Sequence, residues 1–197
     1  MHGLPRLPFS RVELSLAGAT LEFLAVEFAR DVEYPTSFGK YTQESVISGY
    51  LHHNLSSSVH SVVFNTGVHD LVIPFSDEAA SVRSYTSNIR WLVSLLADAL
   101  KPGRSKLVWV NTSRVVAKNQ PSTWRNLTSN RRISQFNAAA DEVMHTIGIP
   151  VLDVHGLSAH PEFQALAVDG IHYGSANGAY YRYVALQLLL LICNDRR

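Results

Sequence analysis

Residues Ser61 to Leu71 read SVVFNTGVHDL, and this stretch indicates the fold of the chain. Its apolar part is short and continuous, which predicts a buried strand over residues 62–65. Gly67 bounds the strand and predicts a polar loop directly after it. Strands without polar alternation are typical of parallel sheets that are covered on both faces. We therefore expect a buried strand that ends in a polar loop.

The segments on either side of this stretch alternate between strand and helix patterns. Apolar residues at helical spacing predict helices over 79–101 and 131–147, and a last helix over 179–193. Further strands are expected over 11–16, 20–28, 106–110 and 150–154, a helix over 43–55, and loops over 33–42, 111–130 and 169–177. This alternation predicts one α/β domain over residues 1–197, with a mostly parallel sheet between two layers of helices.

Composition excludes some classes of function. The net charge of +1 provides no field that would recruit nucleic acid. The longest apolar run, Val184 to Cys193, is interrupted by Gln187 and is too short to span a bilayer, so we expect a buried terminal helix and no membrane span. Cys193 is the single cysteine, which rules out an intramolecular disulfide and predicts a buried thiol.

Signals for the cellular compartment point in two directions. Asn-x-Ser/Thr triplets begin at Asn54, Asn111 and Asn126, which favours the secretory route or an extracellular setting. Residues 1–10 lack the long apolar stretch of a signal peptide, which argues the other way.

The tetrapeptide Asp169-Gly170-Ile171-His172 is a candidate acid–base pair. A carboxylate three residues before a histidine can accept the imidazole Nδ1 hydrogen, which leaves Nε2 as a general base. The alternative is an exposed loop pair with no chemical role. The position directly before the last helix of an α/β pattern favours the chemical interpretation, because working loops lie at the carboxyl ends of parallel strands.

The loop after the strand at 62–65 is a candidate oxyanion site. Asn65 or His69 could donate a hydrogen bond to a developing negative charge, and Asp70 could tie the loop down by accepting backbone N–H bonds. The alternative is an ordinary turn after a strand, with His69 partly buried.

These two motifs, in this order and at this separation, resemble the blocks of the SGNH/GDSL-type hydrolases. The chain is most similar to the PC-esterase-like branch, in which the Gly-x-Asn-Asp block becomes Gly-x-His-Asp, here Gly67 to Asp70. The last block, Asp-x-x-His, corresponds to Asp169 and His172, and the resemblance covers roughly residues 20–195.

The resemblance implies a flavodoxin-like three-layer α/β/α fold and ester hydrolysis or acyl transfer, often on acetylated glycans. It implies His172 as the base and Asp169 as its orienting partner. It also implies that Gly67 and His69 stand at the oxyanion block, where an imidazole N–H replaces the amide donor.

The chain departs from this family at the nucleophile. No Gly-Asp-Ser block occurs in the sequence, and we expect the block to be missing from the N-terminal part. The family's second block is not identifiable either, and Gly18 is its nearest candidate. Ser15 is a substitute nucleophile, although its place in the strand alternation also fits a solvent-facing serine.

Other polar residues have competing interpretations. Trp124 and Arg125 lie in the long polar loop and could contact substrate, or Trp124 could simply fold onto the surface. Adjacent histidines at 52–53 do not face one another on a helix, and Asp153, His155 and His160 lack the spacing of a zinc signature. We expect no metal and no cofactor.

Two functions from different classes follow. One is an esterase acting on an ester or an acetylated glycan; the other is an inactive relative that binds glycan or protein through the same cleft. A nucleotide-binding domain is disfavoured, because no Gly-rich phosphate loop follows any expected strand. The sequence leaves the oligomeric state open.

Overall fold

The computed structural model describes residues 34–36, 39–41, 60–68, 70–72, 77–100, 105–174 and 178–193. Within these ranges three parallel strands form the central sheet in the order β3-β4-β5: β3 (Ser61–Phe64), β4 (Lys106–Val110) and β5 (Val151–Leu152). Their carboxyl ends therefore lie at one edge of the sheet.

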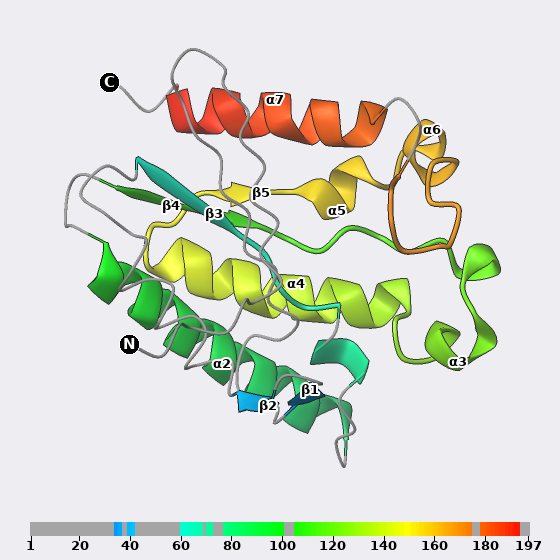
Figure 1. Ribbon diagram of the computed structural model, residues 1–197, viewed down its shortest axis with the longest axis horizontal. Coiled ribbons are helices and arrows are strands. Elements are labelled where there is room, and N and C mark those ends of the chain that lie inside the picture. Colours follow the sequence, from blue (N-terminus) through cyan, green and yellow to red (C-terminus); the bar gives the residue numbers. More distant parts are fainter. Residues whose placement is uncertain are drawn as a thin grey trace.

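Helices cover both faces of this sheet (Figure 1). α2 (Glu78–Ala99) and α4 (Asn130–Thr146) pack together on one face, and α7 (Ala179–Cys193) lies on the other. Side-chain caps fix the starts of the first two helices: Asp77 accepts a hydrogen bond from the Ala80 N–H at 2.6 Å, and Ser129 accepts one from the Arg132 N–H. The expected α/β/α arrangement is thereby confirmed.

The main core lies between the sheet and the pair α2 and α4. It contains Trp109 of β4, which is fully buried and packs against the ring of Phe64 at a centroid distance of 5.2 Å. Its other buried members are Leu71, Tyr85, Ile89, Val93, Val115, Ile133, Phe136, Ala140, Val143 and Met144. Eight of these ten come from α2 and α4, as the helical spacing of their apolar residues predicts.

The connections contain more structure than the sequence pattern indicates. Residues 33–42, expected as a loop, include an antiparallel hairpin of β1 (Tyr34–Thr36) and β2 (Gly39–Tyr41). These strands are three residues each, too short for a periodicity to register. The expected strand at 150–154 has only two residues in β5, because Asp153 caps α5 (Val154–Leu157) through the Gly156 N–H.

The expected loop at 111–130 is largely folded. It contains η2 (Ala117–Asn119) and α3 (Ser122–Arg125), and Gln120 and Thr128 are buried and joined by a hydrogen bond of 2.8 Å. Shorter helical turns elsewhere are η1 (Asp70–Val72) and α6 (Pro161–Gln164). The polar composition of this segment predicted a loop, whereas some of its polar side chains are buried and bonded to one another inside the fold.

The prediction of a buried terminal helix is wrong. α7 packs through Tyr180 and Val184. Leu188, Leu191 and Ile192 are only partly buried. The other large apolar side chains of this helix are exposed: Tyr181, Tyr183, Leu186, Leu189 and Leu190. The Cys193 thiol at its end is exposed as well, contrary to expectation. When a helix is apolar on every face, its sequence does not show which face is buried. The elements expected at 11–16, 20–28 and 43–55, with Ser15 and Gly18, lie outside the described residues.

Candidate active site

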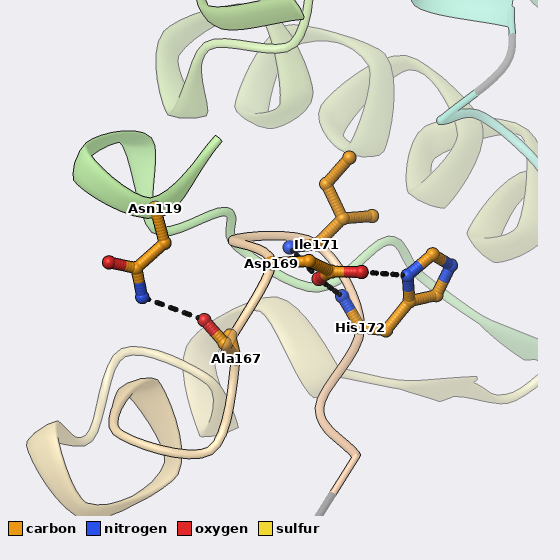
Figure 2. Close-up of polar contacts among 5 residues, drawn as sticks. All are labelled: Asn119, Ala167, Asp169, Ile171 and His172. Carbon is orange, nitrogen blue, oxygen red and sulfur yellow. Dashed lines mark hydrogen bonds and ion pairs between the residues drawn. The ribbon is translucent and has the colours of Figure 1, made fainter. Parts of the chain in front are cut away.

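The Asp169–His172 pair forms within a single loop (Figure 2). The imidazole Nδ1–H of His172 donates to Asp169 Oδ2 at 2.6 Å. The other carboxylate oxygen, Oδ1, accepts the backbone N–H groups of Ile171 at 2.9 Å and His172 at 2.8 Å. Asp169 thus holds both the ring and the backbone of His172, which fixes the tautomer with a hydrogen on Nδ1.

These hydrogen bonds stabilise the charged form of the carboxylate. The bond from the His172 side chain, followed by those from the His172 and Ile171 backbone, lowers the pKa of Asp169 to about 2. Asp169 is therefore ionised throughout the neutral range. The His172 side chain is 75% exposed and Asp169 is 55% exposed, so the pair is open to solvent.

A left-handed glycine makes this loop tight. Gly170 has a φ of +82°, a conformation that L side chains rarely adopt. Its backbone N–H closes a turn onto the Ala167 carbonyl at 3.0 Å, and its carbonyl accepts the Val116 N–H at 2.8 Å. The loop therefore rests on the segment that follows β4.

The loop after β3 is held at one backbone carbonyl. The Thr66 carbonyl accepts hydrogen bonds from the Tyr85 hydroxyl at 3.0 Å and from the Thr112 hydroxyl at 3.2 Å. Burial raises the pKa of Tyr85 well above its ordinary value, and the charges of Asp70 and Asp141 add to this, so the phenol stays a donor. Because Thr112 follows β4, these contacts join the ends of β3 and β4.

The residues predicted for the oxyanion site differ in what they contact. Asn65 follows β3, but its Nδ2 donates to the Val110 carbonyl at 2.6 Å, so one amide hydrogen is committed to the backbone. Asp70 is buried and accepts the Thr66 hydroxyl at 2.9 Å, which ties the loop together through a side chain. Gly67 is buried with a φ of +138°, and His69 lies outside the described residues.

The end of β4 is supported by a bridge of side chains. The Asn111 amide donates to Asp141 at 3.2 Å and to Asp153 at 3.0 Å, and its oxygen accepts the His155 N–H at 2.9 Å. Burial raises the pKa of Asp141. The hydrogen bonds from Asn111 and Trp109 lower it in part, and the pKa stays above its ordinary value. Asp153 and His155 thus brace the strand end.

Trp124 and Arg125, the candidate substrate contacts, lie on α3. Arg125 Nε donates to the Gln120 carbonyl at 3.2 Å, and the Trp124 carbonyl accepts the Thr128 hydroxyl at 2.9 Å. These contacts hold both residues within the segment after β4, and a contact of either residue with substrate stays a prediction.

The described residues do not show a nucleophile bonded to His172. Ser15 lies outside the described residues, and within the described ranges no serine or threonine hydroxyl has a hydrogen bond to His172. Two residues that no sequence pattern singles out, Val116 and Asn119, contact the loop instead. The contact of Asn119 with this loop spans 48 positions of sequence, so no local pattern or polar composition could have predicted it.

Comparisons with known proteins add one finding about the fold. No protein-family model matches the sequence, and no curated protein matches it. The structure is similar to the crystal structure of the lipase/acylhydrolase from Enterococcus faecalis, with a TM-score of 0.53 and 19% identity over 76% of this chain and 69% of that chain. None of the helices in the described ranges is long and apolar enough to cross a bilayer. The chain therefore shares its α/β fold with a lipase/acylhydrolase.

Proposed function

We propose that this chain is an SGNH-type carboxylic-ester hydrolase domain in which Asp169 and His172 form the acid–base pair. One observation carries the proposal: the 2.6 Å bond between His172 Nδ1 and Asp169 Oδ2 sits in a loop that rests on the segment after β4. Nε2 of His172 makes no hydrogen bond within the described residues, so that nitrogen is available to take a proton. The shared fold with a lipase/acylhydrolase supports this function.

The reaction would follow the serine-hydrolase scheme. A serine oxygen forms a bond to the acyl carbon of the ester, and its proton passes to His172 Nε2. Asp169, ionised with a pKa of about 2, stabilises the imidazolium that forms. The proton on Nε2 then passes to the departing alcohol oxygen as the ester C–O bond breaks. Water repeats the sequence on the acyl-enzyme.

The loop from Gly67 to Asp70 is the proposed oxyanion block. Thr66, Tyr85 and Thr112 fix the backbone of this loop, and a fixed backbone is what an oxyanion site requires. His69 would provide an imidazole donor in this block. Ser15 is the proposed nucleophile within the chain, and the PC-esterase-like branch with an O-acetylated glycan substrate is the proposed subclass.

A second proposal is a binding protein that keeps the fold without the reaction. The 75% exposure of His172 favours it, because a working triad holds its histidine against the nucleophile. The exposed sequon at Asn126 favours a secretory or extracellular setting for either function.

Hydrolysis of p-nitrophenyl acetate tests the proposed function. We would compare the purified chain with His172→Ala, Asp169→Asn and Ser15→Ala. The esterase proposal expects the first two variants to lose about a hundredfold or more in kcat. Equal rates for the chain and His172→Ala would rule out this site, and glycan binding would then be measured directly. Ser15→Ala with unchanged kcat would exclude Ser15 as the nucleophile.

A further inference from the structure

The segment after β4 supports the Asp169–His172 loop at two carbonyl oxygens. The Val116 N–H donates to the Gly170 carbonyl at 2.8 Å, and Nδ2 of Asn119 donates to the Ala167 carbonyl at 2.8 Å. Figure 2 shows the Asn119 amide pointing at Ala167, just ahead of the turn that carries Asp169. One of these two supports is a side chain and can be removed by substitution.

The contact between the two segments is close. A Cβ atom at Gly170 would lie 2.7 Å from the Val116 carbonyl oxygen and 2.8 Å from the Gln120 backbone nitrogen. The turn therefore lies directly on the backbone of residues 116–120, with no room for a side chain between them. A support this close transmits small displacements to the loop.

The Ala167 carbonyl is the point at which the turn closes. Ala167 is fully buried, and its oxygen accepts both the Gly170 N–H at 3.0 Å and the Asn119 amide. The residues that follow donate their N–H groups to Asp169 Oδ1. Loss of the Asn119 amide would therefore loosen the turn on which the Asp169 hydrogen bonds depend.

We propose that Asn119 is a positioning residue that fixes the Asp169–His172 pair through the Ala167 carbonyl. Asn119 has no hydrogen bond to either member of the pair, so it acts through the turn. The consequence for catalysis rests on the proposed esterase function, whereas the effect on the carboxylate does not.

Two substitutions remove the donor in different ways. Asn119→Ala deletes the amide. Asn119→Asp keeps the shape but replaces the donor with a carboxylate oxygen facing the Ala167 carbonyl, which is repulsive. Asn126→Ala is the matched control, because Asn126 is exposed nearby and its side chain makes no hydrogen bond within the described residues.

The first readout does not require activity. Carboxyl carbon resonances in ¹³C-labelled protein would follow the ionisation of Asp169 from pH 7 to pH 1. With its pKa at about 2, the wild-type carboxylate stays ionised at pH 3. In Asn119→Ala and Asn119→Asp we expect the midpoint to rise by about one pH unit, because the donors that hold the charge lose their alignment. Asn126→Ala should titrate as the wild type does.

The second readout is the rate. With p-nitrophenyl acetate we expect kcat of both Asn119 variants to fall about tenfold, with KM within about twofold, since a displaced base lowers the rate more than binding. A general loss of structure would instead lower the thermal midpoint and reduce the active fraction of the sample.

The outcomes separate the two proposals. If the Asn119 variants raise the Asp169 midpoint and the wild-type chain has no esterase activity, the positioning contact is supported and the esterase proposal is overturned. An unchanged midpoint overturns the positioning role, whatever the rate. In an active chain, an Asn119→Ala variant with the wild-type kcat also overturns it.

Discussion

The indole Nε1–H of Trp109, which is fully buried on β4, donates to Asp141 Oδ1 on α4 at 3.0 Å. The second oxygen of this carboxylate accepts the Asn111 amide at 3.2 Å. A single carboxylate on α4 thus satisfies the indole in the core and the amide at the end of β4. Through it, the helix that covers the sheet also sets the strand end beneath the candidate site.

Asp141→Ala is expected to destabilise the fold by about 1–3 kcal/mol, because it leaves the buried Trp109 donor without its acceptor. Glu142→Ala is the control, since the next residue of α4 is exposed. Urea unfolding followed by tryptophan fluorescence measures both. Equal midpoints for the two variants would show that the indole finds another acceptor.

Gly67→Ala tests the backbone of the loop after β3. Gly67 has a φ of +138°, and an added Cβ would lie 2.8 Å from the Thr112 hydroxyl and 3.1 Å from the Tyr85 hydroxyl. Moving these groups would weaken both bonds to the Thr66 carbonyl, so we expect a loss of about 2–3 kcal/mol.

Gly148→Ala separates strain from steric conflict in this experiment. Gly148 has a φ of +74°, with nothing within 4 Å of an added Cβ, so its replacement costs only the backbone term of about 1–2 kcal/mol. Thermal unfolding compares the two variants. A Gly67→Ala variant as stable as Gly148→Ala would mean that the hydroxyl groups adjust freely.

Gly170→Ala is expected to lift the Asp169–His172 loop from its support. An added Cβ would meet the Gln120 side chain at Cγ, and also two backbone atoms that cannot rotate away, the Val116 carbonyl oxygen and the Gln120 nitrogen. Amide hydrogen exchange at Val116 should therefore accelerate about tenfold or more, because its acceptor is the Gly170 carbonyl.

Gly178→Ala serves as the comparison for that variant. Gly178 has a φ of +55° and open space around an added Cβ. Its replacement should leave Val116 exchange at the wild-type rate. Full protection of Val116 in Gly170→Ala would contradict the close contact.

Acid should remove the contribution of Asp169 to stability. Its pKa of about 2 in the folded state lies below the value of about 3.9 for an unfolded chain, so its contribution is present above pH 4 and is lost as the pH falls through 2. The difference in unfolding free energy between the wild type and Asp169→Asn should be smaller at pH 3 than at pH 7. Because the side chain is 55% exposed, the whole effect is modest. A constant difference across this range would argue against the hydrogen bonds to the carboxylate.

Local sequence patterns predicted the features that depend on residues close together in the chain. Helical spacing in α2 and α4, and the apolar runs of β3 and β4, placed those elements to within about two residues. Asp169 and His172 were recognised because a carboxylate and an imidazole three residues apart can meet in one turn. Their contact is a geometric result, whereas their catalytic role remains a prediction.

Features that depend on distant partners were missed. Asn111 lies in a sequon and in a polar stretch, yet it is buried and its amide is bonded to Asp141 and Asp153. Asn126, in a second sequon, is exposed. The two triplets look alike in sequence, because burial depends on which residues the fold brings to them.

The loop that carries Asp169 and His172 has a consequence for how the site assembles. Joining two residues three positions apart closes a very short segment of chain and costs little conformational entropy. Holding that segment against the residues after β4 depends on distant contacts such as the one from Asn119 to Ala167, which spans 48 positions and closes a far longer loop. The acid–base pair is therefore expected to form early in folding, and its placement late.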